Sequence, residues 1–244
     1  MSIPAHPVRI PDRVRALAPG ADLTAVWVND AGGVTFRGVR EDETVFVKLQ
    51  PRYGETPVAA EVERLLWAAS YTAVPRVREW GAEGDEEWLV TLGMAGEGAV
   101  SPRGMRAPRQ AVRAIGEGLR AWHDRLPTSD CPFTWDVAGR IAAARERGIV
   151  VPPALHDAPQ VDRLVVCHGD ACAPNTLIDR DGRWAGHVDV GALGVADRWA
   201  DIAVASMSLE WNYGPGWDSE FFAAYGVAPD TVRLAFYRDL WNAT

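Results

Sequence analysis

The chain has 244 residues, of which 48% are hydrophobic and 24% charged, an ordinary globular composition that excludes a disordered or fibrous protein. No apolar run approaches the roughly 20 residues of a membrane helix, and the N-terminus lacks a signal-peptide pattern. The three cysteines fit no zinc or disulfide framework. We therefore expect a cytoplasmic protein without membrane partners. The net charge of −8 argues against nucleic acid and is compatible with a polycationic ligand or with the acidic balance of many cytosolic proteins.

The first part of the chain is predicted to be rich in β-structure. Turn-forming residues at 29–33 and 40–43 separate runs that alternate apolar and polar side chains, which indicates an antiparallel meander. The turn at 29–33 could cover phosphates, but it lacks a G-x-G-x-x-G pattern, and a plain hairpin turn explains it equally well. Residues 57–70 show helical spacing of apolar side chains. The predicted strands are 23–28, 34–39, 44–49, 74–77 and 88–92.

The second part is predicted to be mostly helical. The glycine-rich stretch 93–98 separates the two parts, and we place residues 1–96 in one domain and 97–244 in the other. The expected fold class is therefore α+β, with a small antiparallel sheet domain and a larger helical one. The predicted helices are 107–126, 137–147, 197–211, 218–225 and 229–241.

The most informative stretch is residues 165–175, V-V-C-H-G-D-A-C-A-P-N, which is followed by a short predicted strand over residues 185–190. Each strand end delivers a carboxylate, Asp170 and Asp189, and Asn175 lies between them. Carboxylate and amide oxygens suit a hard cation such as magnesium, and a further carboxylate can orient a hydroxyl for phosphoryl transfer. We therefore predict Asp170 as the catalytic base and Asn175 and Asp189 as ligands of Mg²⁺.

The same residues permit a second interpretation. His168 with Asp170, and His187 with Asp189, form two His-x-Asp pairs of the kind that serve a two-metal hydrolase. In a strand, His187 and Asp189 would share one face and could coordinate together.

The order H-x-D-x-x-x-x-N, followed by a second aspartate, resembles the catalytic and metal-binding loops of the protein-kinase-like fold. It is closer still to the aminoglycoside phosphotransferases, which carry H-G-D-x-x-x-x-N and then I-D-x-G-x-x-G-x-A-D-x-x-x-D-I-A. Residues 188–203 read V-D-V-G-A-L-G-V-A-D-R-W-A-D-I-A, and the match covers most of residues 165–203. The resemblance implies a bilobal protein-kinase-like fold, ATP and Mg²⁺ as cofactors, and a cationic antibiotic as substrate.

The resemblance also implies how the nucleotide is bound. Lys48 ends a strand similar to the V-A-I-K strand whose lysine pairs with ATP phosphates. Glu61 on the next helix would hold that ammonium group, with Glu63 as the competing partner. Leu92 and Met94 lie in the segment where such kinases bind adenine through main-chain groups, and this segment would be a hinge.

Three further residues have supporting roles in this interpretation. Asp201 resembles the family's buried helical aspartate, which would accept hydrogen bonds from the backbone of the catalytic loop. His168 would brace that loop rather than perform chemistry. His123 matches a family helix and is expected to be a packed structural histidine.

The substrate is argued separately, because this fold accommodates several acceptors. The H-G-D-A-C-A-P-N stretch and the end of the chain look most like streptomycin 3''-phosphotransferases, so we expect a monomeric enzyme that confers streptomycin resistance. Acidic side chains would receive the cationic substrate by charge-assisted hydrogen bonds. The alternatives are a kanamycin-type 3'-phosphotransferase and a choline, homoserine or sugar kinase. The candidate substrate residues are Glu210, Asp218 and Asp239.

Overall fold

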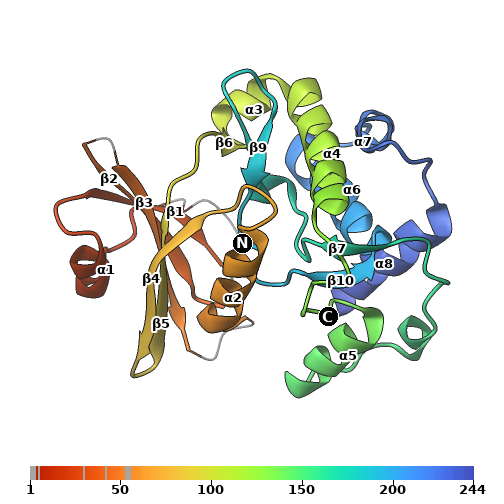
Figure 1. Ribbon diagram of the computed structural model, residues 1–244, viewed down its shortest axis with the longest axis horizontal. Coiled ribbons are helices and arrows are strands. Elements are labelled where there is room, and N and C mark those ends of the chain that lie inside the picture. Colours follow the sequence, from red (N-terminus) through yellow and green to blue (C-terminus); the bar gives the residue numbers. More distant parts are fainter. Residues whose placement is uncertain (1–3, 5, 30, 42, 53–55) are drawn as a thin grey trace. The chain divides into compact units, whose positions relative to one another are not determined.

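The computed structural model resolves the chain into two compact units (Figure 1). The first unit comprises Met1–Ser70 and Val74–Met94, and the second comprises Tyr71–Ala73 and Ala95–Thr244. An antiparallel sheet dominates the first unit and helices dominate the second, as the sequence predicts. None of the described helices is long and apolar enough to cross a bilayer. The residues that the structure describes are 4, 6–29, 31–41, 43–52 and 56–244.

The first unit is built on a five-stranded antiparallel sheet in the order β1-β2-β3-β5-β4. Its buried face carries Phe36, Val47 and Val90, which pack with Val14 from a short helix that the sequence did not predict, α1 (Asp12–Leu17). Alternation of apolar and polar residues therefore places one face of β2, β3 and β5 in the core. The strands are β1 (Asp22–Val28), β2 (Val34–Arg40), β3 (Glu43–Pro51), β4 (Arg76–Glu83) and β5 (Glu86–Leu92).

Two features of this sheet differ from the prediction or lie outside the description. The strand predicted at 74–77 begins at Arg76 and continues to Glu83, because it pairs along its length with β5. Most side chains of this edge strand are exposed and several are charged, so its sequence lacks the clear alternation of apolar and polar residues that predicts a strand. Asp30 and Asp42, in the two predicted turns, lie outside the described residues.

Helix α2 (Val58–Ala68) covers the region predicted at 57–70. Val58, Val62 and Leu65 are buried on one face, as their three- and four-residue spacing predicts. The Glu87 carboxylate accepts hydrogen bonds from the backbone N–H of Val58, at 3.0 Å, and from the Gln50 side chain, at 2.6 Å. This contact satisfies an N–H at the helix start that has no partner within the helix.

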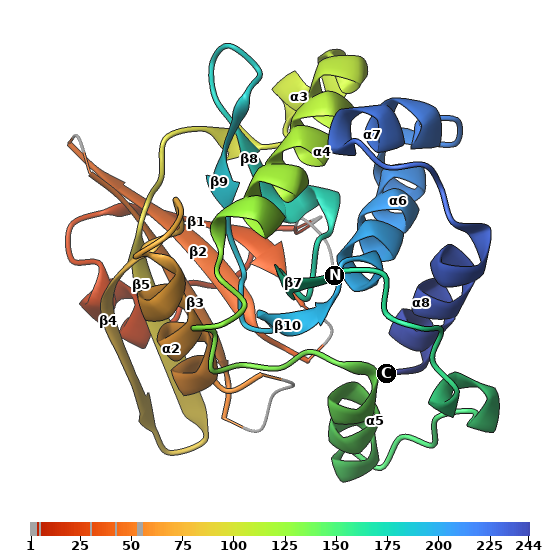
Figure 2. The same cartoon turned by 45° about the vertical axis from the view of Figure 1, so that its right-hand side comes forward.

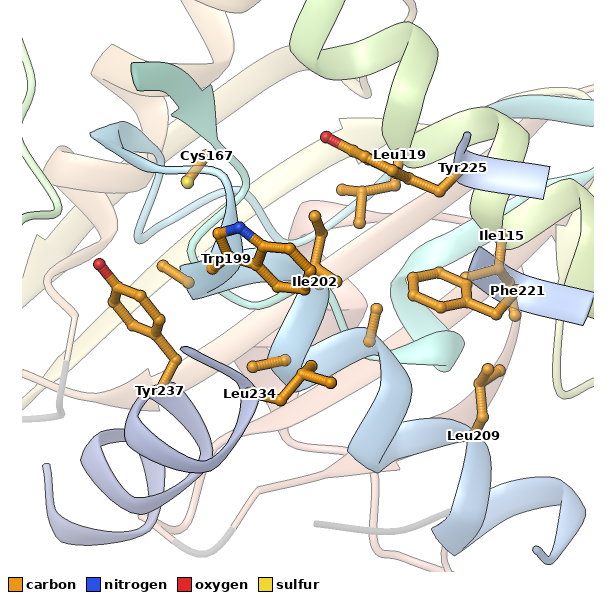
Figure 3. Close-up of a cluster of buried hydrophobic side chains, with 14 of the residues drawn as sticks. Ile115, Leu119, Cys167, Trp199, Ile202, Leu209, Phe221, Tyr225, Leu234 and Tyr237 are labelled. Atoms are coloured by element: carbon orange, nitrogen blue, oxygen red, sulfur yellow. The ribbon is translucent and has the colours of Figure 1, made fainter. Parts of the chain in front are cut away.

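The second unit packs its helices around one large core (Figure 3). Figure 2 shows α6 and α8 side by side, with α7 beside α4. Ile115, Ile202, Phe221 and Tyr225 are almost wholly buried where these helices meet. The helices are α3 (Pro102–Arg106), α4 (Pro108–Arg125), α5 (Val137–Glu146), α6 (Trp199–Tyr213), α7 (Asp218–Tyr225) and α8 (Thr231–Ala243), with 3-10 turns η1 (Pro153–His156) and η2 (Ala173–Asn175).

Short strands between the helices carry the motif of interest. Strand β7 (Leu164–Cys167) pairs with β10 (Gly194–Asp197), and this pairing explains why the helix predicted at 197–211 begins only at Trp199. The prediction of a strand over residues 185–190 was wrong at its C-terminal boundary, because β9 ends at His187. The remaining sheet has the order β6-β8-β9, with bounds β6 (Glu97–Gly98), β8 (Thr176–Ile178) and β9 (Trp184–His187).

A fully buried carboxylate on α6 ties the loop after β7 to the helices. Asp201 accepts hydrogen bonds from the backbone N–H of His168, at 2.6 Å, and of Gly169, at 2.9 Å. His123 on α4 donates from Nε2 to the same carboxylate at 3.0 Å, and its Nδ1 lies 2.8 Å from the Tyr225 hydroxyl. His123 is therefore a packed histidine, as predicted, and Asp201 contacts the loop in the way that the resemblance implies.

The ionisation of Asp201 depends on these contacts. Burial by itself opposes the charged form, but hydrogen bonding and charge from His123, together with the His168 backbone, outweigh it and hold the pKa of Asp201 below the ordinary value of 3.8. The native state therefore favours the ionised carboxylate more than the unfolded chain does. Its stabilising contribution is complete above pH 3.8 and is lost as the pH falls through the lower native pKa.

We predict that Asp201→Asn lowers the free energy of unfolding at pH 7 by about 1–3 kcal/mol, because the amide places an N–H group against backbone donors. The difference between the variant and the wild type should shrink as the pH falls below 3.8, because the carboxylate of the unfolded chain takes up a proton first and the native one follows at its lower pKa. Urea titrations followed by circular dichroism at pH 3–7 measure both effects. Asp181→Asn, at an exposed hairpin tip, is the control, and an equal loss in both variants would contradict the prediction.

Candidate active site

Asp170 stands at the exit of a turn that only glycine can make. Strand β7 ends at Cys167, and Gly169 has a φ of +85°. A Cβ atom at Gly169 would lie 2.2 Å from the backbone oxygen of Ala192, so any side chain would displace the loop. The turn therefore presents Asp170 directly after a buried strand.

A hairpin brings the other two candidate residues to the same place. Asn175 precedes β8 and Asp189 follows β9 by two residues, and the register pairs Thr176 with His187. The backbone N–H of Val188 donates to the backbone oxygen of Asn175 at 3.0 Å. Asp189 has a φ of +60°, a left-handed conformation that is uncommon for a residue other than glycine. Such strained residues gather at functional sites.

Asp170 and Asn175 are in direct contact. The Asn175 side-chain amide donates to both the backbone oxygen and Oδ2 of Asp170, each at 3.0 Å. The side-chain oxygen of Asn175 is consequently the atom left for a cation. Oδ1 of Asp170 is buried and has no hydrogen-bond partner among the described residues. A buried acceptor without a donor is costly, and it suits a group that receives a hydroxyl proton.

Asp170 and Asp189 also influence each other electrostatically. Burial, followed by the negative charge of Asp189, raises the pKa of Asp170 above its ordinary value. The Asn175 amide oxygen and the Asp189 carboxylate form a donor set made only of oxygen, which is the set that magnesium prefers. A bound divalent cation would offset the repulsion between the carboxylates, so the residues present fit Mg²⁺.

The histidines of this region are engaged in packing and hydrogen bonds. His168 is wholly buried; its Nδ1 accepts from the Asp170 N–H at 3.2 Å, and its Nε2 donates to the backbone oxygen of Val188 at 3.0 Å. His187 accepts from the Trp184 indole at 3.1 Å, and burial keeps its pKa well below the ordinary value.

These contacts argue against the two-metal hydrolase. Both nitrogens of His168 are occupied, and β9 ends at His187, so His187 and Asp189 do not share the face of one strand. The sequence interpretation assumed that the strand continued to residue 190. Instead the chain turns, and Asp189 adopts its left-handed conformation.

The first unit carries the predicted lysine–glutamate pair. The Lys48 ammonium on β3 lies 2.8 Å from Oε2 of Glu61 on α2. The Glu61 side chain is 8% exposed, whereas Glu63 is exposed to solvent, so Glu61 is the partner, as predicted. The pair is well protected from screening because little of either side chain reaches water.

The predicted adenine-binding segment lies at the end of β5. Leu92 is the last residue of that strand, and Met94 is the last residue of the first unit. The N–H of Gly93 donates to the backbone oxygen of Thr44 at 2.7 Å, which anchors the segment to β3. Adenine binding by Leu92 and Met94 stays a prediction.

Sequence reasoning missed one support of the loop. The Ser208 hydroxyl on α6 accepts from the backbone N–H of Ala173 at 2.9 Å, and the Asn212 amide donates to the Ser208 backbone oxygen at 2.8 Å. Ser208 is 1% exposed. Its distance of seven residues from Asp201 could have suggested this role, because residues two helical turns apart share a face.

The candidate substrate residues are spread over three places. Glu210 is exposed near the end of α6, and Asp239 is exposed on α8. Asp218, at the start of α7, accepts a 2.5 Å hydrogen bond from Ser206, which in turn accepts one from Arg238 at 2.6 Å. A role of these carboxylates in substrate binding stays a prediction.

Comparison with known proteins agrees with this geometry. The profile of the Phosphotransferase enzyme family matches residues 13–237. An aminoglycoside 3'-phosphotransferase of Streptomyces fradiae is 33% identical, over 92% of this chain and 96% of the relative. A streptomycin 3''-kinase of Streptomyces griseus is 32% identical, over 91% of this chain and 92% of the relative.

Solved structures show the same relationship. An aminoglycoside-3'-phosphotransferase of type VIII has a TM-score of 0.80 and 29% identity, covering 96% of this chain and 97% of its own. An aminoglycoside phosphotransferase, APH(3'')-Id from Streptomyces rimosus ATCC10970, solved with ADP and streptomycin, has a TM-score of 0.74 and 28% identity, covering 95% and 96%. The predicted protein-kinase-like fold is thereby confirmed, and the chain belongs to the aminoglycoside phosphotransferases of the Phosphotransferase enzyme family.

Proposed function

We propose that this enzyme transfers the γ-phosphoryl group of ATP to the 3''-hydroxyl of streptomycin and thereby confers resistance. The observation that carries the reaction is the carboxylate of Asp170 beside Asn175 and Asp189, whose buried Oδ1 has no geometric hydrogen-bond donor in the described part of the chain. An acceptor in that position takes the proton of the attacking hydroxyl while the new O–P bond forms and ADP leaves.

The remaining residues bind and orient the nucleotide in this proposal. Lys48, held by Glu61, contacts ATP phosphates, and Leu92 and Met94 contact adenine through their main chain. Asn175 and Asp189 hold Mg²⁺, which neutralises charge on the phosphate oxygens when bound. Asp201 and His168 fix the loop on which Asp170 stands.

A kanamycin-type 3'-phosphotransferase is the second candidate. Its support is that relatives of both kinds match almost equally well, at 33% and 32% identity. We choose streptomycin as the proposed substrate because the H-G-D-A-C-A-P-N sequence resembles that of streptomycin 3''-phosphotransferases and because a structural neighbour was solved with streptomycin bound. The acidic net charge of −8 suits both drugs.

Substrate choice is tested by coupled assays of ATP consumption with streptomycin, kanamycin, hygromycin, choline and homoserine. We expect the highest kcat/KM with streptomycin and, by NMR of the product, a phosphate on the 3''-oxygen. Raised salt should increase KM for the drug more than KM for ATP, because exposed charge pairs are screened within about 10 Å at 0.1 M. Preference for kanamycin would support the second candidate, and turnover of choline or homoserine alone would overturn both.

Asp170→Ala should lower kcat by about 10²–10⁴-fold, which is the usual contribution of a general base. Binding of a non-hydrolysable ATP analogue should stay close to wild type, because this carboxylate orients the acceptor hydroxyl. Steady-state kinetics and calorimetry measure the two quantities, with the exposed Asp181→Asn as the control. Turnover at the wild-type rate would remove Asp170 from the mechanism.

Asp189→Ala should raise the magnesium concentration for half-maximal velocity by at least about tenfold. Asn175→Ala should raise it less, since a neutral amide attracts a cation more weakly than a carboxylate. Magnesium titrations of activity at saturating ATP establish the order. An unchanged magnesium dependence in both variants would show that the ligands were assigned wrongly.

A further inference from the structure

Side chains on one face of α6 bind the backbone of the catalytic loop, which comprises residues 168–175. Asp201 binds the N–H groups of His168 and Gly169, and Ser208 binds the N–H of Ala173. These two helical residues are seven positions apart, so they lie nearly above one another on the helix. The loop therefore runs along this face from the first turn of α6 towards its end.

Trp211 is the next large side chain on that face. It follows Ser208 by three residues, which places it on the same side and about 4.5 Å farther along the axis. The indole-bearing side chain is 58% exposed. Nearby Tyr213 and Trp217 instead pack against the core and donate hydrogen bonds to backbone oxygens. An indole exposed on the helix face that holds the catalytic loop is available to a bound molecule, because it combines a large apolar ring with a polar N–H.

Glu210, the acidic residue that the sequence suggested, lies elsewhere on the helix. It follows Ser208 by two residues, a rotation of about 200°, and so faces away from the loop. It shares its side of α6 with Ser206, which binds Asp218. Helix geometry therefore favours Trp211 over Glu210 and Asp218 as the residue of this region that meets a substrate held at Asp170.

We infer that Trp211 is a substrate-binding residue whose ring stacks on a planar guanidinium group of the acceptor. This inference rests on the proposed function and narrows its substrate class to aminoglycosides that carry guanidino groups. A guanidinium is flat and weakly hydrated, so it stacks on an indole face, whereas an ammonium group is compact and strongly hydrated. Trp211 thereby selects streptomycin over drugs that carry only amino groups.

The test compares Trp211→Leu, Trp211→Phe and the control Trp80→Leu, which removes a 50% exposed tryptophan from β4. Trp211→Leu should raise KM for streptomycin by about 3- to 30-fold with kcat nearly unchanged. Trp211→Phe should retain part of the affinity, because its ring still attracts cations. KM for kanamycin and for ATP should change little, and Trp80→Leu should behave as wild type.

Calorimetric titration of streptomycin into the ADP-bound protein separates this inference from the proposed function. If the wild type phosphorylates streptomycin and Trp211→Leu leaves its KM and binding unchanged, the inference fails and the proposed function stands. If no aminoglycoside is phosphorylated, the proposed function fails, and streptomycin binding that weakens only in Trp211→Leu still supports the stacking role. A wild type that does not bind streptomycin overturns the inference.

Discussion

The Asp201 carboxylate is the contact on which the catalytic region of the second unit depends. It is almost wholly buried, yet its pKa is lowered, because two loop N–H groups and His123 supply the hydrogen bonds that water would otherwise provide. A buried charge is tolerated only with such partners. These hydrogen bonds fix the backbone of the segment after β7, and Gly169 makes the tight turn that this conformation requires.

The active site joins two groups that repel each other. Asp170 and Asp189 are close enough for the charge of one to raise the pKa of the other, and Oδ1 of Asp170 has no donor in the described part of the chain. Without a ligand, this arrangement lowers the stability of the protein. A bound cation would reduce the repulsion between the carboxylates, and an acceptor hydroxyl would donate to Oδ1. The site is thus organised for the bound state, which is what electrostatic stabilisation of phosphoryl transfer needs.

The same helix serves positioning and recognition. Asp201 and Ser208 on α6 hold the loop, and Trp211 continues their face into solvent. A substrate-binding side chain on a rigid helix keeps its distance from Asp170 better than one on a loop. An aromatic residue at this place also gives a physical basis for discrimination among cations, which net charge alone cannot give.

The sequence by itself determined the α+β class, most strands and helices, and the order of Asp170, Asn175 and Asp189, whereas the choice of Glu61 over Glu63 as the partner of Lys48 came from the structure. These features depend on spacing between near neighbours, which the sequence displays directly. Only the tertiary structure decided that β10 pairs with β7, that β9 ends before Asp189, and that His123, Asp201 and Tyr225 form one network. It also decided which face of α6 meets the loop, and the inference about Trp211 rests on that face. Contacts of this kind join residues far apart in the chain, and long-range packing selects them.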